Sequence, residues 1–189
     1  MFIQTEATPN PEVLKFLPGL PVTGSGTATF SAETGSEGSP LARRLLEVPG
    51  VIEVFLAPDF ISVTKQATGD WQRLKPAILG AIMEHYQSGE PVLVDAARNA
   101  AADTAGESYD PADAEIVVQI KELLETRVRP AVARDGGDIV FRGFDQGVVY
   151  LHMQGSCSGC PSSTATLKMG IEQLLKHYVP EVVEVRALG

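Results

Sequence analysis

The only two cysteines of the 189-residue chain, Cys157 and Cys160, lie three residues apart in a short stretch rich in Gly, Ser and Pro. Two thiols at this spacing in a turn can aim both sulfurs at one point. Such a pair can hold a soft metal or an iron–sulfur cluster, or it can close as a redox disulfide. The spacing by itself leaves these chemistries open.

The flanking sequence places the pair between a strand and a helix. Residues 147–153 are mostly apolar or β-branched, which predicts a strand, and residues 167–178 repeat apolar side chains at helical spacing. Pro161 suits the first turn of this helix, where its missing N–H costs nothing. We expect the amide groups and the dipole at the helix N-terminus to favour the thiolate over the thiol and to stabilise an anionic cluster.

The remaining C-terminal segments complete a small domain over residues 110–189. Asp110 is a helix cap with Pro111 at the first position, and Pro130 should kink or end the helix that follows. Two strands are then expected at 138–144 and 147–153, with a last strand at 182–185 after the second helix. The order α-β-β-α-β predicts a two-layer sandwich.

The first 90 residues predict a second small α/β-sandwich domain, so the fold class is α+β. Strands are expected at residues 2–5, 14–17, 27–31, 51–56 and 60–64, with helices that start after caps at Ser39 and Asp70. This half contains no cysteine, and His85 and Trp71 are better explained as packing or surface residues than as ligands. An alanine-rich, acidic linker is expected over residues 91–109, long enough for one domain to swing around the other.

Charge and composition exclude several classes of partner. The net charge of −9 argues against a nucleic-acid backbone or an anionic membrane, and no segment approaches the ~20 apolar residues that span a bilayer. The first residues lack a basic and apolar signal segment and lack the Arg-rich character of a transit peptide, so we expect a cytoplasmic, bacterial-type location. In a reducing compartment a lone CxxC pair is more typical of metal binding or catalysis than of a structural disulfide.

The residues around the cysteines resemble a known family. Asp135-Gly136-Gly137-Asp138, a hairpin, and then Gly-Ser-Cys-x-x-Cys-Pro-Ser-Ser-Thr before a helix closely resemble the NifU-like C-terminal (Nfu-type) domain, over about 75 residues. Met-Phe-Ile-Gln-Thr-Glu and Thr-Pro-Asn-Pro near the start look like the N-terminal domain that precedes it in Nfu proteins. Glu12 and Ala57 depart from that pattern, where Asn and Gly are expected.

The resemblance implies a non-enzymatic iron–sulfur cluster scaffold and carrier. Cys157 and Cys160 would be the metal ligands that bind the cluster, and the N-terminal domain would recognise partners. These partners would be an upstream cluster donor and apo iron–sulfur client proteins. Because a [4Fe–4S] cluster takes four thiolates and one chain supplies two, we expect a cluster-loaded homodimer; a [2Fe–2S] cluster is the alternative.

Two other functions use the same cysteines. A thiol–disulfide oxidoreductase is the main rival, because a CxxC between a strand and a helix also describes a thioredoxin site. The late position of the pair in the α-β-β-α-β unit and the absence of an aromatic residue before Cys157 argue against it. A structural zinc site normally needs four protein ligands, and His152 is better explained as a strand residue than as a third ligand. Asp135 and Asp138, separated by two glycines, indicate a turn rather than an acid–base pair.

Overall fold

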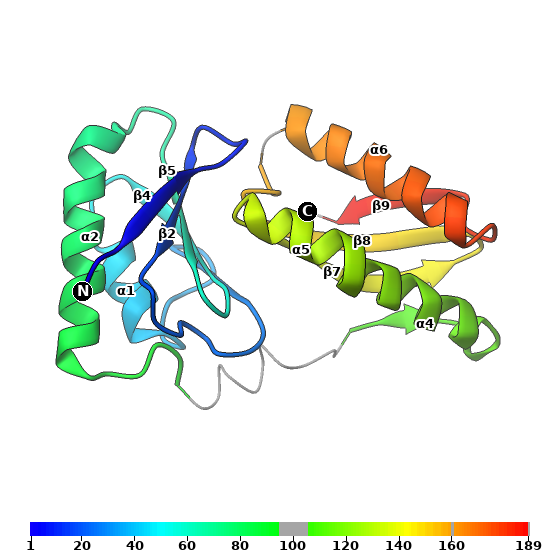
Figure 1. Cartoon of the computed structure of the whole chain (residues 1–189), viewed down its shortest axis with the longest axis horizontal. Helices are drawn as coiled ribbons and strands as arrows, with labels where there is room; N and C mark the ends of the chain where they lie inside the picture. The colour runs from blue at the N-terminus through cyan, green and yellow to red at the C-terminus, as the bar shows by residue number, and fades with distance from the viewer. Residues whose placement is uncertain (95–105, 160, 189) are drawn as a thin grey trace. The chain divides into compact units, whose positions relative to one another are not determined.

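The computed structural model describes residues 1–94, 106–159 and 161–188, with the backbone alone for residues 161–163. The chain divides into two compact units, Met1–Asp103 and Thr104–Gly189 (Figure 1). Each unit combines helices with one sheet and has its own hydrophobic core. The predicted α+β class is therefore confirmed. Most of the linker expected at 91–109 lies outside the described residues.

The N-terminal unit contains a five-stranded antiparallel sheet with the order β1-β2-β5-β4-β3. Its strands are β1 (Gln4–Ala7), β2 (Val13–Leu17), β3 (Ala28–Ser31), β4 (Val51–Leu56) and β5 (Ile61–Lys65). Helices α1 (Pro40–Leu46) and α2 (Trp71–Ser88) pack on each other and share one core with the sheet (Figure 1). This is the two-layer arrangement that the sequence predicts.

Both helices of this unit start at the predicted caps. Ser39 Oγ accepts a hydrogen bond from Ala42 N at 3.0 Å, and Asp70 Oδ1 accepts one from Gln72 N at 2.9 Å. After α2, Val92 and Leu93 are buried in the same core. The core of this unit therefore includes residues past position 90, and Ser39 Oγ donates a hydrogen bond to Val92 O at 2.6 Å.

The C-terminal unit contains a four-stranded sheet with the order β6-β7-β8-β9. Its strands are β6 (Ser108–Tyr109), β7 (Gly137–Asp145), β8 (Val148–Gly155) and β9 (Glu184–Leu188). β7 and β8 form the expected antiparallel hairpin, whereas β6 pairs with β7 and β9 pairs with β8 in parallel. The two residues of β6, placed in the linker by the sequence, form a strand because they pair with the outer edge of β7.

The helical layer of this unit has a wide turn in its first helix. A short 3₁₀ turn η1 (Pro111–Asp113) leads into α4 (Ala114–Leu123), the π-helical turn η2 (Leu124–Val128) and α5 (Arg129–Arg134). Pro130 has no N–H to donate to the carbonyl four residues earlier, so the regular α-helical hydrogen bonding is interrupted there. The proline therefore distorts the helix, as the sequence predicts, and the helical path continues to Arg134.

A crossover from β8 through α6 (Pro161–Tyr178) to β9 completes the unit. Leu151 of β8, Leu175 of α6 and Val185 of β9 are all fully buried in its core. The chain therefore leaves the carboxyl end of β8 at a fixed place. Residues 156–159, which contain Cys157 and are called the cysteine turn below, follow directly. No helix in the described part of the chain is long and apolar enough to cross a membrane.

Candidate functional site

Cys157 lies in the turn between β8 and α6, as the sequence predicts. β8 ends at Gly155, whose φ of +62° turns the chain away from the sheet. The Cys157 side chain is buried, with 5% of its surface exposed, and belongs to the core of the C-terminal unit. Cys160 lies outside the described residues, so the structure gives a position to one of the two predicted ligands.

Hydrogen bonds from the small polar residues of the motif fix this turn at both ends. Ser158 donates to Gly155 O from its backbone N at 3.1 Å and from its Oγ at 2.8 Å. Thr164 Oγ1, on the first turns of α6, donates to Cys157 O at 3.0 Å. The serine and threonine of the motif thus position the cysteine backbone.

A second turn, residues 135–136 between α5 and β7, lies directly against the cysteine turn, together with Gly137 at the start of β7. Ser156 N donates to Gly136 O at 3.2 Å, and Ser156 Oγ donates to Asp135 O. A Cβ atom on Gly137 would lie only 2.4 Å from Cys157 Sγ, so the two turns approach as closely as a glycine allows. The structure therefore brings the Asp-Gly-Gly-Asp motif and the cysteine motif into one site.

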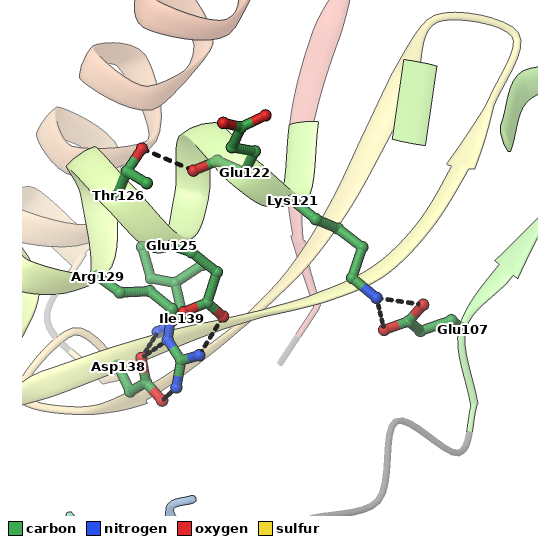
Figure 2. Close-up of polar contacts among 8 residues, drawn as sticks. All are labelled: Glu107, Lys121, Glu122, Glu125, Thr126, Arg129, Asp138 and Ile139. Atoms are coloured by element: carbon green, nitrogen blue, oxygen red, sulfur yellow. Dashed lines mark hydrogen bonds and ion pairs between the residues drawn. The ribbon is translucent and has the colours of Figure 1, made fainter. Parts of the chain in front are cut away.

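Asp138 continues this site into β7. Gly136 has φ +81°, which confirms the predicted turn. The Asp138 side chain is buried and accepts two hydrogen bonds of 2.8 Å from Arg129, at Oδ1 from Nε and at Oδ2 from Nη2 (Figure 2). Its Oδ1 also accepts from Ile139 N at 2.8 Å. The sequence analysis missed Arg129; the one available signal was an aspartate beginning an apolar strand, which needs a partner when buried.

The environment of Cys157 holds its thiol in the neutral form. Burial raises the pKa of Cys157 to about 12; a hydrogen bond with Ser156 opposes this shift, and the negative charges of Asp135 and Asp138 add to it. The expectation that the helix N-terminus favours the thiolate is therefore wrong for Cys157. Desolvation and two nearby carboxylates raise the pKa of Cys157 instead.

This raised pKa predicts slow alkylation of the apo protein. In a Cys160→Ser variant, iodoacetamide at pH 8 should modify Cys157 about three orders of magnitude more slowly than a free cysteine, because only the thiolate reacts. The alkylation rate of the folded variant should rise with pH up to the raised pKa. After unfolding in urea, the variant should react at the same rate as a free cysteine. Mass spectrometry of timed samples measures the rate. Rapid alkylation of the folded variant at pH 7 would contradict the burial described here.

The described residues of one chain do not supply a complete metal site. Within residues 1–94, 106–159 and 161–188, no three His, Cys, Asp or Glu side chains are grouped so that they could hold a metal ion. His152, considered as a third ligand, lies in the middle of β8 opposite Val140 of β7. It is a strand residue in this structure.

Two family models match separate parts of the chain. Residues 3–89 match the model of the scaffold protein Nfu/NifU N-terminal domain, and residues 120–186 match that of the NifU-like domain. The chain therefore belongs to the Nfu/NifU family, with the N-terminal domain followed by the NifU-like domain. The recognition made from the sequence motifs is confirmed.

Relatives of similar sequence span nearly the whole chain. NifU-like protein 4, mitochondrial, from Arabidopsis thaliana is 53% identical over 184 residues, which cover 96% of this chain and 64% of the relative. The NFU1 iron-sulfur cluster scaffold homolog, mitochondrial, of Drosophila sechellia is 52% identical over 186 residues, covering 98% and 64%. The solution structure of a NifU-like protein from Saccharomyces cerevisiae matches with a TM-score of 0.46 and 28% identity, over 50% of this chain and 86% of that one.

The names of these relatives correct the expected location. Relatives from a plant and from several flies are named mitochondrial, so the expectation of a cytoplasmic, bacterial-type protein is wrong. That expectation rested on the character of the first few residues. This chain spans 64% of the length of the two relatives described above.

Proposed function

We propose that this protein is an iron–sulfur cluster scaffold and carrier, with Cys157 and Cys160 as the cluster ligands. The observation that carries the proposal is the packing of the Asp-Gly-Gly-Asp turn against the cysteine turn at the end of β8, inside a matched NifU-like domain. Thiolates suit iron–sulfur clusters because both are soft. The name of a similar fly protein, an iron-sulfur cluster scaffold homolog, supports the same function.

The raised pKa of Cys157 has a consequence for cluster binding. The thiol must lose its proton when it becomes a ligand, because iron binds the thiolate. Apo Cys157 is thus kept as a protonated thiol, and uptake of a cluster is coupled to proton release. A protein that loads and unloads its cargo benefits from a site that is stable in both states.

The cluster is proposed to be [4Fe–4S], shared by two copies of the chain. Four thiolates are needed, and each chain contains two cysteines. In a two-fold dimer the pairs from both chains would meet at the symmetry axis. A cluster at such a boundary can leave when the chains separate, without unfolding of either.

Anaerobic reconstitution with iron and sulfide, followed by sedimentation velocity and iron analysis, tests this proposal. We expect a brown, oxygen-labile dimer with about four iron atoms per dimer and a largely monomeric apo protein. A colourless product with no bound iron would overturn the scaffold function. A cluster-loaded monomer without small-thiol ligands would overturn the shared site only.

The N-terminal unit is proposed to recognise partner proteins, namely cluster donors and apo acceptors. It contains no cysteine and has its own core, so its removal should leave cluster binding intact. A fragment lacking residues 1–95 should therefore take up as much cluster as the full chain but transfer it to several apo-acceptors with less selectivity. Transfer rates followed by circular dichroism decide this. Equal rates from fragment and full chain to every acceptor would contradict the role.

A thiol–disulfide oxidoreductase remains the second candidate, and the pKa of Cys157 argues against it. Attack on a disulfide needs a thiolate, and such enzymes lower the pKa of the attacking cysteine, whereas burial raises it here. Reduction of an insulin disulfide by the apo protein at neutral pH, at a rate well above that of free dithiothreitol, would favour the enzyme.

A further inference from the structure

Asp138 places a negative charge beside the site where an anionic cluster is proposed to bind. Asp138 is 4% exposed and is the second residue of β7, directly after Gly137, whose added Cβ would meet Cys157 Sγ. A [4Fe–4S] cluster with four thiolates is itself anionic, and charges in a partly desolvated site interact more strongly than in water. An uncompensated Asp138 would therefore oppose retention of the cluster.

Arg129 supplies the compensating charge. Its Nε and Nη2 each lie 2.8 Å from one oxygen of Asp138, the forked geometry in which a guanidinium binds a carboxylate most strongly (Figure 2). The Arg129 side chain is 32% exposed, so it connects the buried aspartate to the protein surface. Arg129 Nη1 also donates to Glu125, one helical turn earlier.

The distorted helix explains how Arg129 reaches this position. Arg129 is the first residue of α5, directly after the π-helical turn η2 and before Pro130. In a regular helix the Thr126 carbonyl would accept from residue 130, and the missing donor widens the turn. Thr126 Oγ1, inside the wide turn, donates to Glu122 O of α4 at 2.7 Å and so connects the turn to the regular helix before it. The local geometry around Pro130 thus sets the direction from which Arg129 approaches β7.

We propose that Arg129 is a positioning residue of the cluster site, which neutralises Asp138 so that an anionic cluster is retained beside Cys157. Asp138 in turn holds the start of β7, because its Oδ1 accepts the Ile139 N–H. The pair thus keeps the structural hydrogen bonds of a carboxylate without its charge. The inference rests on the proposed scaffold function and names a residue outside the motifs that suggested it.

Four variants of the full chain separate the charge of the pair from its hydrogen bonds. Arg129→Gln removes the positive charge that the fork places on Asp138, and Arg129→Lys keeps that charge without the fork. Asp138→Asn removes the negative charge but keeps an acceptor for Ile139 N, and the double variant Arg129→Gln/Asp138→Asn is neutral throughout. Lys121→Gln is the matched control, because Lys121 pairs with Glu107 at 2.8 Å in the same helical layer (Figure 2).

The readout is the rate of iron release from reconstituted protein into excess chelator, followed by the loss of visible absorbance. Arg129→Gln should release iron about tenfold faster than the wild type, because the guanidinium charge that offsets Asp138 is then lost. Arg129→Lys, Asp138→Asn and the double variant should release iron within about twofold of the wild-type rate. Lys121→Gln should match the wild type.

The following outcomes would overturn the inference that the charge of Arg129 helps to retain the cluster. If the double variant releases iron as fast as Arg129→Gln, the pair acts through structure and not through charge. The same conclusion follows if Arg129→Lys is as fast as Arg129→Gln, or if all variants equal the wild type. A wild-type chain that takes up no cluster would overturn the proposed function as well, which distinguishes the two failures. Far-UV circular dichroism of the apo forms identifies a variant that has unfolded, and the remaining variants then decide.

Discussion

Replacing Cys157 with serine is expected to remove nearly all bound iron while the far-UV circular dichroism of the apo protein stays unchanged at low temperature. Serine has the size of cysteine, but its hard oxygen is a poor ligand for iron in a sulfide-rich cluster, so iron content should fall about tenfold or more. Cys157 is 5% exposed, and a buried hydroxyl without a full set of partners should lower the free energy of unfolding by about 1–3 kcal/mol.

Cys157→Ala is the matched control for this experiment. It removes the ligand without burying a new polar group, so it should lose the same amount of iron with a smaller loss of stability. Iron analysis after anaerobic reconstitution and urea unfolding of both apo variants measure the two effects separately. Full iron occupancy in the serine variant would contradict the assignment of Cys157 as a ligand.

Replacing Gly137 with alanine should affect both stability and cluster binding. The new Cβ would lie 2.4 Å from Cys157 Sγ and 2.8 Å from Gln154 O, and the second of these atoms belongs to the backbone of β8. The two turns would have to separate, which should lower the free energy of unfolding by about 1–3 kcal/mol. Because the new Cβ would overlap with Cys157 Sγ, this sulfur should move, and the variant should retain less iron.

Gly170→Ala is the control for this substitution. Gly170 lies inside α6, and nothing lies within 4 Å of its added Cβ. Alanine there should raise the free energy of unfolding by about 0.5–1 kcal/mol, because glycine is a poor helix former, with unchanged iron content. Urea unfolding and iron analysis of both variants provide the comparison. A Gly137→Ala variant as stable as the wild type would show that the turns can separate without cost.

Local sequence signals predicted most elements of the fold. Caps at Ser39 and Asp70 start α1 and α2 where they were expected, because capping depends on residues within one turn of each other. Gln146 and Gly147 form the turn of the hairpin between β7 and β8, and their φ angles of +46° and +84° suit such a turn. The short strand β6 was missed, because its two residues form a strand only by pairing with β7.

The sequence by itself determined the class of fold, the family and the turn in which Cys157 lies. These follow from residue types within a few positions of each other, which act through local geometry. The tertiary structure alone decided the state of the Cys157 thiol and the pairing of Arg129 with Asp138. Both depend on burial and on charges that are brought together from distant segments. The strength of an electrostatic interaction depends on distance and on the exclusion of water, and neither is fixed until α5, β7 and the cysteine turn have packed together.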